Sequence, residues 1–145
     1  MRDIEQIIKQ IYAQATLLGA CSLFTGQEKT LEEIVKLFTT PQGQEFCIEN
    51  HFPNIATMRL FKQFGMERYG IYIDAGVITL TNPDRAVIIG KTSATVNLDT
   101  LARHEVTFMH GAKGTVNASK WAVARVKTGA GCSVIKNVFN NAIIL

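Results

Sequence analysis

The alternation of apolar and polar residues between positions 86 and 145 constrains the fold more than any other feature of this chain. Apolar side chains occupy twenty of the thirty even positions in this span but only ten of the thirty odd positions. Successive side chains of a strand point to opposite faces, so one extra residue at a turn would exchange the two faces. The even face nevertheless persists across the whole span. The pattern therefore predicts short strands that wind round one narrow core, joined by corners that preserve the alternation.

Short sequence repeats support a winding chain. The triplet TVN at 95–97 returns at 115–117, and Ile89-Gly90, His110-Gly111 and Thr128-Gly129 each end a strand-like run. Coils of about 18 to 21 residues fall within the range of known repeat proteins. We therefore predict a short β-solenoid-like domain, a single-chain β-helix, over residues 69–145. A compact β-sandwich or roll with N-terminal helices is the alternative.

The first part of the chain has helical spacing instead. An apolar stripe recurs at three- and four-residue steps from Ile4 to Ala15, and a capping box at Thr30 predicts a second helix. A third helix is expected over 44–50, and a fourth from Asn54 to Phe64, closed by Gly65. The protein is thus expected to be α+β, with an N-terminal helical subdomain over 1–68 that caps the first coil.

The composition limits compartment and cofactor. The three cysteines, Cys21, Cys47 and Cys132, are odd in number and widely spaced, which argues against a disulfide framework and predicts small buried side chains. No C-x-x-C pair supports zinc, and we expect neither metal nor cofactor. Mixed charges at the N-terminus argue against a signal peptide, and no apolar run approaches the roughly 18 residues of a membrane span. The sequence predicts a cytoplasmic protein with no membrane partner.

Apparent catalytic motifs are weak. IIGKT at 88–92 ends like a phosphate-binding loop, but Arg85 stands where that loop needs glycine, and β-patterned sequence follows. A strand ending in a glycine corner is the preferred interpretation. His104 and His110 share the inward parity and are interpreted as core or corner histidines rather than metal ligands. Residues 85–145 hold only Asp99 and Glu105 as acidic groups, which disfavours paired-carboxylate catalysis, and no catalytic residue is assigned.

The charge is divided unevenly along the chain. Residues 1–84 carry seven basic and ten acidic side chains, whereas 85–145 carry eight basic and two acidic ones. The predicted ligand-binding residues are outward by parity: Lys91, Lys113, Trp121, Arg125 and Lys127. Basic groups with interspersed aromatics suit a polyanion, either nucleic acid or acidic polysaccharide. The alternatives are a solvated surface for the charges and an interface, or contact with the helical half, for Trp121.

The C-terminal stretch NNAIIL is apolar and lies at a strand edge. An unpaired edge strand tends to associate, so Ile143, Ile144 and Leu145 are predicted to form an oligomer interface. We expect a non-enzymatic scaffold or protein-interaction module that self-associates, as a homodimer or higher, through this C-terminal β edge. The alternative is a polyanion-binding module using the basic outer face, and a small-molecule enzyme is third.

Overall fold

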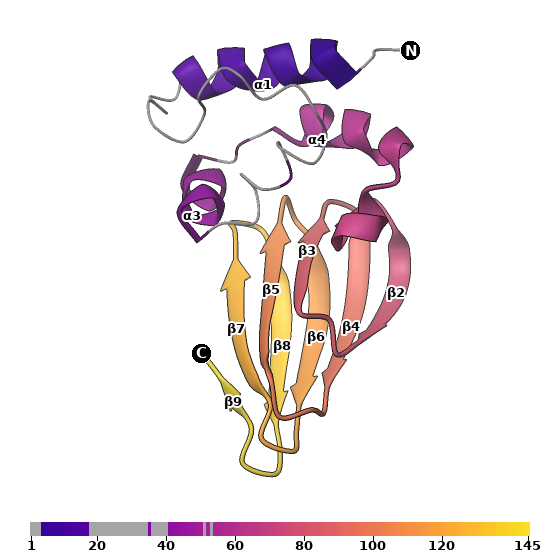
Figure 1. The fold of residues 1–145 in the computed structure, drawn as a ribbon, viewed down its shortest axis with the longest axis vertical. Helices are drawn as coiled ribbons and strands as arrows, with labels where there is room; N and C mark the ends of the chain where they lie inside the picture. Colours follow the sequence, from indigo (N-terminus) through magenta and orange to yellow (C-terminus); the bar gives the residue numbers. More distant parts are fainter. Residues whose placement is uncertain (1–3, 18–34, 36–40, 51, 53) are drawn as a thin grey trace. The chain divides into compact units, whose positions relative to one another are not determined.

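The computed structural model describes residues 4–17, 35, 41–50, 52 and 54–145 (Figure 1). The chain divides into two compact units, Met1–Gly65 and Met66–Leu145. The helix expected from Thr30 and the thiol of Cys21 lie outside the described residues. The N-terminal unit contains helices, whereas the C-terminal unit contains all the strands of the described chain.

Helix α1 spans Ile4–Leu17, and its apolar stripe is confirmed. Ile7, Ile8 and Ile11 are buried, as the three- and four-residue spacing predicts. Helix α3 spans Pro41–Asn50, three residues earlier than its expected start at Gln44. Proline is well tolerated in the first turn of a helix, where its missing N–H would have no partner in any case. Pro41 therefore begins this helix rather than interrupting the chain before it.

Helix α4 spans Ile55–Phe61 and continues as the 3₁₀ helix η1, Lys62–Phe64. The predicted closure at Gly65 is confirmed, and Asn54, expected as the first helical residue, is the N-cap instead. The side chain of Asn54 accepts a hydrogen bond from the N–H of Thr57 at 2.8 Å, and Gly65 ends the segment in the left-handed region at φ 68°. Phe61 is fully buried, and α4 contacts α1 within this unit.

The C-terminal unit is a parallel β-solenoid of about four turns, which confirms the predicted fold. A short 3₁₀ helix, η2 (Met66–Tyr69), precedes the strands. One sheet has the order β1 (Ile71–Ile73), β3 (Arg85–Ile89), β5 (Arg103–Met109), β7 (Val123–Thr128) and β9 (Ile143–Ile144). The other has β2 (Gly76–Thr81), β4 (Thr92–Leu98), β6 (Lys113–Ala118) and β8 (Ser133–Val138). Consecutive strands alternate between the sheets, and all paired neighbours are parallel (Figure 1).

The register explains why TVN repeats. Thr95 pairs with Thr115 and Asn97 with Asn117, so equivalent residues of neighbouring coils are 20 positions apart. The first coil is shorter than expected, because Ile71 pairs with Val87 and Gly76 with Thr92. That offset is also even. The same side chains therefore point inward in every coil, whatever its length.

Two-residue corners preserve the alternation between strands. Both residues of the pairs His110-Gly111, Lys120-Trp121 and Asn140-Asn141 have positive φ angles. The hydrogen bond that closes each corner joins residues three apart, as from the N–H of Ala142 to the carbonyl of Phe139 at 3.0 Å. This is the backbone geometry of type I′ turns, which favours glycine and asparagine. Corners recur every ten residues, and ten is even.

The core of the solenoid consists entirely of even-numbered residues. The buried members are Ala86, Ile88, Ala94, Val96, Leu98, Val106, Phe108, Ala112, Val116, Ala118, Ala122, Ala124, Val126 and Ala142. Small residues predominate, and one glycine makes room for the largest member. A Cβ on Gly114 would lie 2.6 Å from the Phe108 ring. The predicted slim core is therefore confirmed, with Gly114 and Phe108 fitted to each other.

Odd positions are not uniformly exposed, however. Val87, Ile89, Thr107 and Met109 point away from this core and are nevertheless buried. They form two columns in the sheet, because Val87 pairs with Thr107 and Ile89 with Met109. Part of the sheet β1-β3-β5 is thus buried on both faces, as is common for parallel sheets. Alternation alone had suggested one buried face.

Candidate functional site

The last coil, residues 133–145, differs from the coils before it in exposure. Within the described chain β8 pairs only with β6, and β9 only with β7. Val138 points inward and aligns with Ala118 and Leu98, which are at most 1% exposed, yet Val138 itself is 49% exposed. Val134 and Ile144 are also only half-buried. This coil therefore exposes apolar side chains at positions whose equivalents in the earlier coils are buried in the core.

Large apolar side chains collect on this coil. Eight of them are exposed among the residues that the structure describes, and five lie between 135 and 145: Ile135, Val138, Phe139, Ile143 and Leu145. The three predicted interface residues are divided by parity. Ile143 and Leu145 are exposed, whereas Ile144 packs against the core cluster. The N–H of Leu145 donates to the carbonyl of Ala124 at 2.7 Å, so the chain remains paired with β7 to its last residue.

A charge interrupts the inward face of the last coil. Lys136 aligns with Val116, which in turn aligns with Val96, and both valines are fully buried. The Lys136 side chain is exposed. Lys120 and Lys136 are the only Lys, Arg, Asp or Glu residues at even positions between 86 and 145. Inward-pointing charges on terminal strands are a known device against edge-to-edge association.

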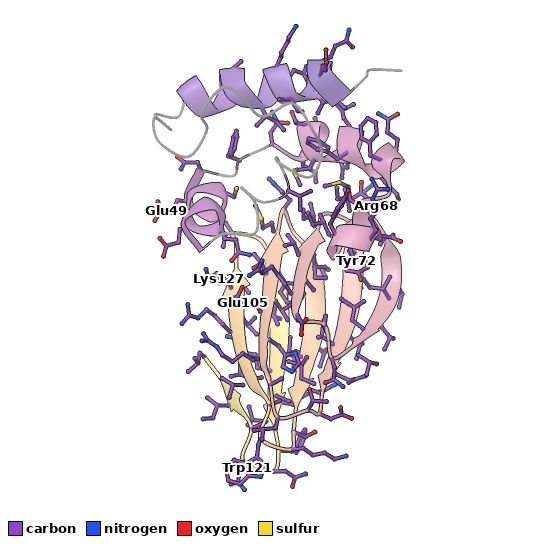
Figure 2. All side chains as sticks on the ribbon, viewed as in Figure 1. Glu49, Arg68, Tyr72, Glu105, Trp121 and Lys127 are labelled. Atoms are coloured by element: carbon purple, nitrogen blue, oxygen red, sulfur yellow. The ribbon has the colours of Figure 1, made fainter. Side chains whose placement is uncertain are left out.

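Three exposed apolar residues lie at one set of corners. Leu101, Trp121 and Asn141 occupy equivalent positions in successive coils, because Arg103 aligns with Val123 and Val123 with Ile143. Phe139 begins the corner at Asn140-Asn141. Leu101, Trp121 and Phe139 are 81%, 60% and 55% exposed. Figure 2 shows Trp121 at the outer tip of its corner, between β6 and β7. We call these three residues the apolar tip.

The predicted basic residues do not share one face. Arg125 and Lys127 lie two residues apart on β7, whereas Lys113 lies on β6 in the other sheet. Lys91 belongs to the corner between β3 and β4, where its backbone N–H donates to the Asp74 carboxylate at 2.7 Å. Parity placed all of them outward. It could not say which sheet each belonged to, because consecutive strands alternate between the two.

The outer face of β5 and β7 carries the densest charge. Arg85 donates from Nε to the Glu105 carboxylate at 3.2 Å, and Glu105 also aligns with Arg125 in the next coil. Glu105 and Lys127 lie near each other on these strands (Figure 2). Arg103 is exposed beside them on β5. Glu105 is the only acidic residue of β3, β5 and β7, and it pairs with Arg85, so Arg103 and Arg125 add an excess of positive charge.

The outer face of the other sheet carries a polar ladder. Asn117 donates from Nδ2 to Oδ1 of Asn97 at 3.1 Å, and Asn137 donates likewise to Asn117 at 2.9 Å. Thr95 and Thr115 form a parallel column beside it. The ladder fixes the register of three coils by side chains as well as by backbone.

His104, the IIGKT segment and Cys47 each have a role in the fold that explains their presence. His104 is 2% exposed, and its Nδ1 lies 2.7 Å from the carbonyl oxygen of Pro83, as expected for a satisfied core histidine. IIGKT is β3, a corner and the start of β4, where the Thr92 hydroxyl donates to the carbonyl of Ile89 at 2.9 Å. Burial raises the pKa of the Cys47 thiol to about 12, so Cys47 is an inert buried side chain.

Metal and membrane signals are absent from the described part of the chain. The described residues contain no group of three or more His, Cys, Asp or Glu side chains placed to hold a metal ion. None of the described helices is both long enough and apolar enough to cross a membrane. Cys47 and Cys132 are both free thiols.

The architecture defines this chain as a two-sheet parallel β-solenoid with N-terminal helices. Comparison with protein-family models, with curated proteins and with solved structures found no match.

Proposed function

We propose that this protein is a non-enzymatic interaction module that self-associates through the surface of its last coil. The observation that carries the proposal is the concentration of exposed apolar side chains there, five of the eight in the described residues. Clustered apolar side chains at the surface of a soluble protein often mark a binding site, and Val138, Phe139 and Ile143 lie within six residues around the last corner. The half-buried inward side chains of Val134 and Ile144 add to that surface.

The free energy gained by burying these side chains is similar in size to the cost of association. Full burial of one such side chain contributes about 1.5–3 kcal/mol. Five of them together would offset a loss of translational and rotational freedom of roughly 4–15 kcal/mol. We therefore expect a reversible dimer that forms at high concentration and dissociates on dilution.

Sedimentation velocity of the full chain tests this directly. Replacing Ile143 and Leu145 together by serine removes two exposed apolar groups without touching the core. We expect the unchanged protein to be dimeric at about 100 μM and the double variant to be largely monomeric. Val77→Ser is the matched control, because Val77 is 89% exposed on β2, away from the last coil. A monomeric unchanged protein at that concentration would overturn the proposal.

A second candidate function is polyanion binding by the outer face of β5 and β7. It is favoured by the exposed Arg103 and Arg125 beside Glu105, which already binds Arg85. Charge-driven binding should weaken steeply as salt rises. We expect Arg125→Glu to reduce binding to single-stranded nucleic acid or acidic polysaccharide, while Lys113→Glu, on the other sheet, has less effect. Absence of binding at low salt would remove this candidate.

A further inference from the structure

The corner at Lys120-Trp121 contains the residue least suited to it. Trp121 has a φ angle of 68°, in the left-handed region, where a residue with a Cβ costs about 1–2 kcal/mol. Corresponding corner positions hold Gly111, Gly131 and Asn141, which tolerate this conformation. Strained conformations of this kind concentrate at sites where the side chain has a function. The corner needs a small residue, so the indole requires another explanation.

The surroundings of Trp121 have the composition of an interface centre. Leu101 occupies the same corner position one coil earlier, and Phe139 begins the corner of the next coil. Polar groups border these three, since Lys120 and Asn140 are both exposed. The corners are also tied together, because the N–H of Trp121 donates to the carbonyl of Asn140 at 3.2 Å. Aromatic anchors surrounded by a polar rim are typical of protein–protein contacts.

Lys136 restricts where a second copy can bind. A partner strand that extended the solenoid over the middle of β8 would bury its ammonium group in line with Val116 and Val96. Burial of an unpaired charge is strongly unfavourable. On the corner side of Lys136, by contrast, Val138 and Phe139 are exposed and lead directly to the apolar tip. The usable apolar surface of the last coil is therefore the part next to Trp121.

We infer that Trp121, together with Leu101 and Phe139, anchors the contact between two copies of this chain. The inference rests on the proposed self-association and names its central residue. Phe139 belongs both to the apolar tip and to the last coil, so the tip continues the surface that we propose binds a second copy. In a two-fold contact the same patch is used by both copies, so each substitution acts twice.

Trp121 is the only tryptophan of the chain, which allows a direct measurement. We expect the fluorescence of the unchanged protein to shift to shorter wavelength as concentration rises, in step with dimer formation followed by sedimentation. Trp121→Asn places at this corner the residue found at position 141. Sedimentation should then show dimerisation weakened by about 100-fold, from roughly tenfold or more per copy for an anchor residue. At concentrations where both proteins are monomeric, the same variant should unfold at a higher temperature, because the strain is relieved.

Lys120→Asn is the matched control. It relieves strain at the neighbouring corner residue and keeps the indole, so its melting temperature should rise while dimerisation stays unchanged. A dimer that forms without a fluorescence shift and survives Trp121→Asn would overturn this inference and leave self-association standing. A monomer at all concentrations would overturn both. A shift that appears only with vesicles of phosphatidylcholine and phosphatidylserine would assign the tip to a lipid surface and overturn the inference. A lower melting temperature for Trp121→Asn would refute the strain argument.

Discussion

The middle coils and the last coil use equivalent positions in different ways. Val116 is fully buried, whereas Lys136, its partner in the register, is exposed; Ala118 is buried, whereas Val138 is half exposed. The backbone pairing is continuous across both. In a repeat protein each coil is covered by its neighbours, so the burial of a side chain depends on the next coil as much as on its own coil. The last coil is therefore free to differ, and its exposed apolar side chains are an example of such a difference.

The sharpest test of this comparison exchanges the two residues. Val116→Lys would bury in a middle coil the charge that the last coil keeps in water. We expect the free energy of unfolding to fall by more than about 3 kcal/mol, because the ammonium would have no partner in the apolar core. Chemical denaturation monitored by circular dichroism measures this.

The reciprocal variant, Lys136→Val, should leave the free energy of unfolding within about 1 kcal/mol of its original value. It should instead promote larger assemblies, visible by light scattering, because the charge that disfavours pairing at the β8 edge is lost. Equal destabilisation by the two changes would show that positions 116 and 136 do not differ in burial as the comparison requires.

Packing inside the middle coils should be intolerant of added volume. Gly114→Ala would place a Cβ 2.6 Å from both the Ala94 carbonyl oxygen and the Phe108 ring. We expect a loss of about 1–3 kcal/mol, as for other overpacked cores. Gly129→Ala is the control, since its Cβ would have only an ordinary contact of 3.5 Å with the Phe108 carbonyl oxygen. Thermal unfolding of the pair should separate them clearly, and equal melting temperatures would show that Phe108 can move aside.

The asparagine ladder gives a smaller contrast. Asn117 makes side-chain hydrogen bonds to both neighbouring coils, whereas Asn137 makes one, to Asn117. At about 0.5–1.5 kcal/mol for each bond, Asn117→Ala should cost roughly twice as much as Asn137→Ala. Urea denaturation of the two variants provides the comparison. A greater loss at Asn137 would contradict the view that the middle coils hold the register.

Thiol labelling should distinguish Cys132, beside the last coil, from Cys47 in the N-terminal unit, and it requires no substitution that alters stability. Cys132 occupies an inward position directly before the last coil and is only half-buried, whereas Cys47 in the N-terminal unit is 4% exposed. Because burial raises the pKa of Cys47 to about 12, its thiol stays protonated at pH 8 to 9, and its burial also keeps reagents away from it. We expect thiol labelling in that range to modify Cys132 and spare Cys47.

Cys132→Ser supplies the assignment, and mass spectrometry locates the label. The raised pKa of Cys47 also predicts that the N-terminal unit loses stability as the pH rises above about 9. Unfolding exposes the thiol, which then releases its proton. Labelling of Cys47 at the rate of an unfolded thiol would contradict its burial.

Much of the fold follows from sequence periodicity. The persistent even face and the TVN repeat are consequences of the two-residue corners and the 20-residue register, and Asn54 and Gly65 mark the ends of the α4–η1 segment by local hydrogen bonding and backbone freedom. These signals are local, so they can be read without tertiary contacts. The shorter first coil was not anticipated, because its even offset leaves no trace in the alternation.

The surface was harder to predict. Outward parity says only that a side chain points away from the core, so it could not separate Lys113 from Arg125 by sheet or detect that Ile89 and Met109 are buried on the outer face. HG and KW lie ten residues apart and NN lies twenty residues after KW, and this spacing was a usable signal for the corners. It would have singled out Trp121 for its backbone conformation rather than for its aromatic ring.

The ten-residue half coil also limits how such a protein can change over generations. Loss of a single codon near residue 112 would turn every later side chain over, sending Arg125 and Lys127 inward and the core alanines out. Duplication of twenty codons would preserve every contact and simply add a coil. Lineages of this architecture are therefore expected to vary in length by whole coils. Inserted coils should lie before Lys136, since a copy of that lysine within the stack would be buried.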